Sequence, residues 1–203
     1  PPDITPQTAE RVDTILDPLA DLGGFHVCWH IPPNRAPDHY ALELLGMALT
    51  DGESSRLYRS MVHEGEVVAE ISASTDDRRG PDLFSVFALL NEGHTGDEAR
   101  ALIDAEIARI GREGLTDREL TRVLNRVRSY FLAGLQSNMD RARNFAEFEL
   151  YFGDAGLLRT ELDLYLAVTT ADIQRVAATY FAPTNRTVLD IVPAPAPAEG
   201  GGN

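Results

Sequence analysis

The segment Phe25–Ile31, with the sequence FHVCWHI, most constrains how this chain can fold. Its aromatic and β-branched residues favour a β-strand, and the two prolines that follow it predict where the strand ends, because proline cannot donate a ladder hydrogen bond. Successive side chains of a strand point to opposite faces, which places four apolar residues on one face: Phe25, Val27, Trp29 and Ile31. The chain therefore needs a sheet with a second layer packed against it.

Helical and extended patterns alternate after this strand. Apolar residues at helical spacing predict a helix over residues 37–50, and a second helix is expected over residues 53–63. Residues 67–74 and 83–90 predict two strands joined by the charged turn TDDRRGPD.

Helix signals dominate the second half. The sequences Thr95-Gly-Asp-Glu98 and Thr116-Asp-Arg-Glu119 match the capping box that opens a helix. They predict helices that run to about residues 112 and 135. Further helices are expected over residues 156–168 and 171–180, the latter capped by Thr170, and a last strand over residues 187–192.

Together these elements predict a single α+β domain over residues 23–193, with helices covering a mostly antiparallel sheet. Residues 1–22 are rich in Pro and Asp and are interpreted as a linker or leading segment. Residues 194–203 are of low complexity and are expected to form a disordered tail.

Composition excludes several classes of function. The 203 residues are 43% hydrophobic and 25% charged, as in a globular protein, and the net charge of −14 argues against a nucleic-acid partner. All 18 basic residues are Arg, which suggests a GC-rich bacterial genome. No membrane-spanning run and no signal peptide are visible, so no membrane partner is expected and a cytoplasmic location is favoured. The chain lacks an initial Met, and we interpret it as a piece of a longer protein.

The stretch DGESSRLYRS, residues 51–60, raises the question of a phosphate-binding or nucleophilic corner. It lacks the Gly-Lys-Ser/Thr ending of a P-loop, and it lacks the second glycine of a nucleophile elbow. We therefore interpret Ser54 as a helix N-cap.

Three residues of the first strand, His26, Cys28 and His30, share one face and form an acceptable set of zinc ligands. Residues i and i+4 of a strand lie about 13 Å apart, however, so a partly exposed sheet face is the preferred interpretation. The remaining histidines stand alone, without an HExxH or HxxEH pattern: His39, His63 and His94. The carboxylates of the charged turns and edges are expected to be solvated: Glu64, Glu66, Glu70, Asp76 and Asp77.

The adjoining stretches HVCWHIPP and DHYALELLGMALTDGESSRLYRSMVHEGEVVAEISAS resemble the pitrilysin/insulinase superfamily of zinc metallopeptidases, in its mitochondrial-processing-peptidase-like branch. Members of that family carry a helix of the type DYYALELLNTILGGG followed by MSSRLFQELREKRGLAYSVSAS. The best matches here are residues 40–45, 54–58 and 71–74. Two later segments, LTDRELTRVLNRVRSYFL and TTADIQRVAATYFAPTNRTVLDIVP, extend the resemblance over roughly residues 22–193.

The resemblance implies a half-clam fold of the mitochondrial-processing-peptidase type, in which two homologous domains enclose a chamber. In the family, one domain carries the zinc motif HxxEH and the opposing domain carries an Arg and a Tyr that hold the substrate backbone. This chain has no HxxEH, so no catalytic residue is expected in it and zinc is expected in the amino-terminal or partner domain. Alignment places the family Arg at Val62 and the Tyr at Ala69, and neither side chain can donate a hydrogen bond. Arg59, one helical turn earlier, is a candidate replacement.

Three functions follow as alternatives. The favoured one is the carboxy-terminal, non-zinc domain of a zinc metalloendopeptidase, which forms a wall of the peptide-degrading chamber without itself cleaving. Its partners would be the peptide substrate and a homologous peptidase domain or subunit, as in a heterodimer. The second is an inactive structural subunit that assembles with an active peptidase. The third is an independent metalloprotein that binds metal through His26, Cys28 and His30.

Overall fold

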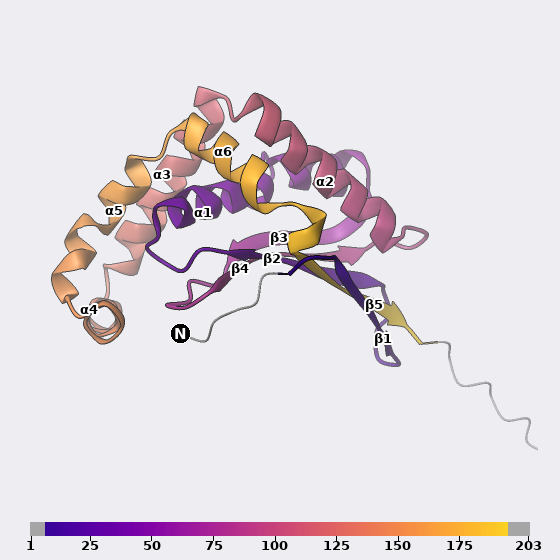
Figure 1. The fold of residues 1–203 in the computed structure, drawn as a ribbon, viewed down its shortest axis with the longest axis horizontal. Coiled ribbons are helices and arrows are strands. Elements are labelled where there is room, and N and C mark those ends of the chain that lie inside the picture. Colours follow the sequence, from indigo (N-terminus) through magenta and orange to yellow (C-terminus); the bar gives the residue numbers. More distant parts are fainter. Residues whose placement is uncertain (1–6, 195–203) are drawn as a thin grey trace, which may run out of the picture.

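The computed structural model describes residues 7–194, which form one sheet with helices packed on one side of it (Figure 1). Buried apolar side chains from both layers meet in one continuous core. The expected α+β fold is thus confirmed. Within the described residues, no helix is long and apolar enough to cross a bilayer.

Five strands form the sheet in the order β1-β5-β2-β4-β3. Their bounds are β1 (Arg11–Asp17), β2 (Gly24–Ile31), β3 (Val68–Thr75), β4 (Asp82–Leu90) and β5 (Arg186–Pro193). Neighbouring strands pair antiparallel except β1 and β5, which pair parallel. The sheet is therefore mostly antiparallel, as the sequence predicts.

The central strand β2 shows the predicted alternation. Phe25, Val27 and Trp29 are at most 1% exposed, whereas His26 is exposed and Cys28 is half-buried. In β4, the residues opposite the buried ones are buried too, since Val27 pairs with Val86 and Trp29 with Phe84. The two strands together present one apolar face to the helices.

The helix predicted over residues 37–50 is α1 (Pro37–Thr50), and it buries Tyr40, Leu44 and Leu45 as expected. The helix predicted over residues 53–63 begins later. Residues 56–57 are helical, and the chain then widens into the π-helix η1 (Tyr58–Glu64). The corner before it is consequently a turn rather than the first turn of a helix.

The next two helices, α2 (Gly96–Glu113) and α3 (Asp117–Gly134), match the prediction. The capping box at Thr116 is complete. At Thr95 the hydroxyl accepts from the amide of Glu98 at 3.2 Å, but the Glu98 carboxylate contacts His94 at 3.0 Å. Only half of the predicted box is present there.

The helices of the last third are α4 (Asn138–Phe152), η2 (Ala155–Leu157), α5 (Leu158–Leu166), α6 (Thr170–Tyr180) and η3 (Pro183–Asn185). The sequence predicts α5 and α6 but not α4. The cap of α6 is Thr169 and not Thr170, because the Thr169 hydroxyl accepts from the amide of Asp172 at 3.2 Å.

The interpretation of residues 1–22 as a linker is wrong for β1. This strand forms an edge of the sheet by pairing with β5, so the two ends of the described chain lie side by side. Residues 1–6 of the predicted linker and residues 195–203 of the predicted tail lie outside the described residues.

Candidate functional site

The corner at residues 51–60 holds two serines with different roles. Ser55 is fully buried, and its hydroxyl donates to the carbonyl of Gly52 at 2.6 Å. Ser54 is exposed, and its hydroxyl accepts from the guanidinium of Arg122. The predicted N-cap at Ser54 is wrong, because the helix begins only at residue 56 and the Ser54 hydroxyl accepts from Arg122 rather than from a backbone amide. An arginine cannot act as the base that a nucleophilic serine needs.

Arg56 explains why this corner has a fixed shape. Its guanidinium bonds the carboxylate of Glu119 at 2.6 and 2.9 Å, and Glu106 at 3.0 Å. It also donates to the carbonyl of Gly114 at 3.3 Å. The hydrogen bond from Arg56 lowers the pKa of Glu119 to about 2. The corner is thereby tied to α2 and α3, which supports a structural role.

The positions aligned with the family's substrate-holding pair carry no hydrogen-bonding side chain. Val62 is half-buried against the core. Ala69 is exposed at an irregularity of β3, where the pairing with β4 shifts between Val68 and Glu70. Arg59 is 67% exposed and lies 3.3 Å from Glu64.

The proposed ligands His26, Cys28 and His30 lie on the sheet face that points away from the helices, as the alternation predicts. His26 makes an edge contact with the ring of Phe87, and the sulfur of Cys28 lies 3.4 Å from the hydroxyl of Ser85. Among the described residues, these three do not form a group whose ligand atoms lie within 4.8 Å of one another.

A different cluster does meet that condition, and it consists of His39, Asp77 and Asp82. His39 is in the first turn of α1, Asp77 is in the turn between β3 and β4, and Asp82 is the first residue of β4. His39 and Asp82 are at most 1% exposed, whereas the side chain of Asp77 is 57% exposed. The expectations that His39 stands alone and that Asp77 is merely solvated are both wrong.

The contacts within this cluster are uneven. Nε2 of His39 lies 3.0 Å from Oδ1 of Asp77, which also accepts from the hydroxyl of Thr75 at 3.0 Å. Nδ1 of His39 lies 3.6 Å from Oδ2 of Asp82, and both atoms are buried without a hydrogen-bond partner. Burial alone would lower the pKa of His39, but the hydrogen bond to Asp77 opposes it, and the pKa of His39 is raised overall. Burial raises the pKa of Asp82.

Glu43 extends the cluster one turn along α1. Burial raises the pKa of this carboxyl to about 7, and the hydroxyl of Tyr165 donates to it. The negative charge of Asp77 adds to the shift. Three carboxyl groups thus surround one imidazole, and among the described residues no Arg side chain is hydrogen-bonded to any of the three.

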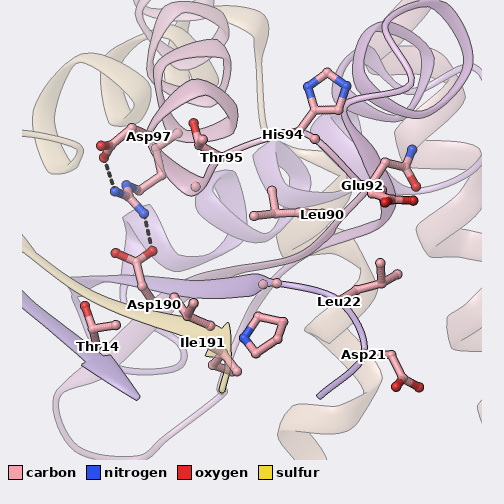
Figure 2. A pocket seen from close by; sticks show the side chains of 18 of the residues that line it. Thr14, Asp21, Leu22, Leu90, Glu92, His94, Thr95, Asp97, Asp190 and Ile191 are labelled. Carbon is pink, nitrogen blue, oxygen red and sulfur yellow. Dashed lines mark hydrogen bonds and ion pairs between the residues drawn. The ribbon is translucent and has the colours of Figure 1, made fainter. Parts of the chain in front are cut away.

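A separate cavity of about 600 Å³ lies between the start of α2 and one end of the sheet (Figure 2). Leu22, Leu90 and Ile191 contribute its apolar wall. Asp97 and Asp190 approach the same guanidinium, that of Arg100, and are joined to it by the dashed lines in Figure 2. Four carboxylates line this cavity, Asp21, Glu92, Asp97 and Asp190, against the single guanidinium of Arg100, so the lining carries an excess of negative charge. The arrangement offers no nucleophile with an adjacent base.

The zinc site that the resemblance places in these enzymes does not fit this chain. HxxEH supplies two histidines and a glutamate base, and the sequence contains no such motif. The cluster at His39 offers a single imidazole, so it is not a substitute for that site. No hydrolytic step can be assigned to these residues.

Comparison with known proteins agrees with the fold and the absent motif. The family model described as the Peptidase M16 inactive domain matches residues 1–127. The zinc protease PqqE of Helicobacter pylori is 25% identical over 175 residues, which are 84% of this chain and 39% of that protein. A zinc protease of Streptomyces coelicolor is 25% identical over 154 residues, 75% of this chain and 33% of that protein. The chain thus spans well under half the length of these relatives.

Solved structures show the same fold. A protease from Helicobacter pylori superimposes with a TM-score of 0.86 at 22% identity, over 93% of this chain and 46% of that one. The inactive peptidase domain of a Bordetella parapertussis protein gives a TM-score of 0.79 at 23% identity, over 89% of this chain and 95% of that one. Because the family model matches more than half of its residues, the chain belongs to the Peptidase M16 inactive domain family, as an inactive, carboxy-terminal type of domain.

Proposed function

We propose that this domain forms one wall of a peptide-degrading chamber and that a homologous, zinc-bearing domain closes the chamber opposite it. The zinc and the catalytic base belong to that other domain, and this chain does not itself cleave. The observation that carries the proposal is the uncovered face of the sheet.

The helices lie on one side of the sheet, so its other face has no covering layer within residues 7–194 (Figure 1). The strand register puts half-buried apolar side chains next to one another on this face: Leu83, Phe87, Leu89, Leu189 and Ile191. A contiguous apolar surface of this kind is typical of a protein interface. We name these five residues the outer face.

The lengths of the relatives support a partner of similar size. This chain covers 46% of the solved Helicobacter pylori protease and 39% of PqqE, so each has room for a second domain. Both partner arrangements, one polypeptide or two subunits, satisfy the proposal.

The test is to purify this chain and the zinc-bearing domain separately and to measure cleavage of an unfolded peptide by each and by the mixture. We expect no cleavage by this chain, with or without added Zn²⁺, because it has no ligand set to activate water beside a glutamate base. The mixture should form a complex and should cleave faster than the zinc-bearing domain alone. Chelator-sensitive cleavage by this chain alone, or equal rates with and without it, would contradict the proposal.

Three variants sharpen this experiment. Phe87→Glu places a charge on the outer face and should weaken the complex at least tenfold, whereas Glu70→Gln on the exposed edge strand β3 is the matched control and should not. Val62→Arg with Ala69→Tyr restores the family pair, and it should leave the isolated chain inactive. A complex unaffected by Phe87→Glu would place the interface elsewhere.

A further inference from the structure

The cluster of His39, Asp77 and Asp82 is not used by the proposed chamber, and it has buried polar atoms without partners. Nδ1 of His39 and Oδ2 of Asp82 face each other at 3.6 Å with neither atom hydrogen-bonded. An N–H···O bond spans about 2.7–3.2 Å, so this gap is too long for a direct bond. A buried polar group without a hydrogen-bond partner destabilises the folded state, and such groups are rare in proteins.

The same gap suits two ligands of one metal ion. Zinc binds imidazole nitrogen and carboxylate oxygen at about 2.0–2.2 Å, and two such ligands at the tetrahedral angle lie about 3.4 Å apart. The observed 3.6 Å therefore needs only a small adjustment to hold an ion between the two atoms. We propose that Nδ1 of His39 and Oδ2 of Asp82 bind a divalent transition-metal ion of the zinc class.

Asp77 occupies the place of the group that orients a metal-binding histidine. Such histidines usually donate their other ring N–H to a carboxylate, which fixes the tautomer and leaves the free nitrogen aimed at the metal. Nε2 of His39 lies 3.0 Å from Asp77, while Nδ1 points to Asp82. Asp77 is thus a positioning residue. Its side chain is 57% exposed, whereas the two proposed ligand atoms are buried.

Charge balance favours a cation at this point. Asp77, Asp82 and Glu43 bring three carboxyl groups to one imidazole, and among residues 7–194 no Arg side chain is hydrogen-bonded to any of them. Buried negative charge is costly unless a cation compensates it. A divalent ion supplies two charges, where a proton on His39 supplies one. The ion would join α1 to the β3–β4 turn and hold these two elements together.

The test uses Zn²⁺ as the probe on the 203-residue chain, stripped with a chelator and then dialysed against the metal. A domain of matching length from Bordetella parapertussis has been crystallised, which supports working with this chain alone. We expect about one equivalent of Zn²⁺ per chain and a rise in Tm that the chelator reverses. The ¹⁵N resonance of Nδ1 of His39 should move on binding, while that of Nε2 should not.

Four variants locate the ion. His39→Gln should abolish binding, and Asp77→Asn should weaken it about 10–100-fold. His94→Gln is the matched control, because its ring also lies 3.0 Å from a carboxylate but near the surface, and it should bind normally. Cys28→Ser should also bind Zn²⁺ normally, which distinguishes the site at His39 from the alternative ligand set at His26, Cys28 and His30.

Stoichiometric Zn²⁺ retained in Asp77→Asn with unchanged affinity, or lost in Cys28→Ser, would overturn the assignment. Absence of binding by the parent chain would show that a proton alone occupies the gap and would also overturn it. Asp77→Asn and the ¹⁵N shift keep the test decisive if His39→Gln does not fold. None of these outcomes depends on whether the domain closes a peptide chamber.

Discussion

Two clusters of charged side chains in this domain differ in whether their buried atoms have partners. Arg56 directs its guanidinium at two carboxylates and a carbonyl, with donor–acceptor distances from 2.6 to 3.3 Å. At the other cluster, atoms of His39 and Asp82 are buried without a partner. Folding alone accounts for the first cluster, because its charges compensate one another. In the second cluster, the buried atoms of His39 and Asp82 gain a partner only when the proposed metal ion binds between them.

The strongest test of this contrast is Arg56→Met. The change keeps much of the apolar stem but leaves the carboxylates of Glu106 and Glu119 without their shared cation. Breaking a largely buried pair in this way typically costs about 3–5 kcal/mol, and the side chain of Arg56 is only 13% exposed. We expect a loss of that size in the free energy of unfolding, measured by urea denaturation.

Arg59→Met is the matched control, since Arg59 is 67% exposed and pairs with Glu64 at the surface. Its cost should stay below about 1 kcal/mol. Equal losses for the two variants would remove the distinction between a partnered cluster and a surface ion pair. Glu106 keeps its bonds to Arg109 at 2.8 and 3.1 Å, so Glu119 is the carboxylate left without a cation. Adding Glu119→Gln to Arg56→Met should therefore recover part of the loss.

The sequence predicted the elements whose buried faces repeat regularly. The alternating apolar residues of β2 and the helically spaced apolar residues of α1 each fit only one type of secondary structure. Both elements lie where the sequence predicts them. The edge strand β1 was missed because six of its seven residues are exposed, so its sequence has no alternation of apolar and polar residues. It is held in the sheet by its pairing with β5. Helix α4 was missed for a similar reason, since none of its residues is buried. Its one local signal was Ser137 with Asp140, whose amide donates to the serine hydroxyl at 3.0 Å.

The candidate metal cluster could not have been read from spacing. His39 and Asp77 are separated by 38 positions, and only the turn between β3 and β4 brings Asp77 and Asp82 back to the start of α1. The motif that spacing did suggest, at His26, Cys28 and His30, follows from one strand face and places its ends too far apart. The alignment that places the family pair at Val62 and Ala69 rests on the flanking residues, and it stays a prediction.

Glu43 provides a second test, which probes the incompletely partnered cluster through pH. Burial raises its pKa in the folded chain to about 7, from a usual value of 4.5. The folded state therefore holds a proton that the unfolded state releases between these values. The stabilisation is fully present below pH 4.5 and is lost as the pH rises through about 7. In chelator-containing buffer, we expect the free energy of unfolding to fall by about 2 kcal/mol between pH 5 and pH 8.

Glu43→Gln should flatten this decline, because the amide does not titrate. Glu98→Gln is the control, since that carboxylate lies near the surface, with its side chain 48% exposed, and the variant should keep the parent's slope. Urea denaturation of the parent and both variants at four or five pH values would give the free energy of unfolding and show whether its slope with pH changes. A slope that remains unchanged in Glu43→Gln would mean that this carboxyl does not carry the raised pKa.

The smallest expected effect separates the two serines next to Arg56. Ser55→Ala removes a buried hydroxyl that bonds the Gly52 carbonyl at 2.6 Å, and it should cost about 1 kcal/mol. Ser54→Ala removes only an exposed contact with Arg122, so its cost should stay within about 0.5 kcal/mol, less than a helix cap would give. Neither change should alter turnover in the assembled peptidase, because neither hydroxyl has a base beside it. A larger loss of stability in Ser54→Ala than in Ser55→Ala would restore the cap at Ser54, and a hundredfold loss of turnover with stability intact would restore a nucleophile at this corner.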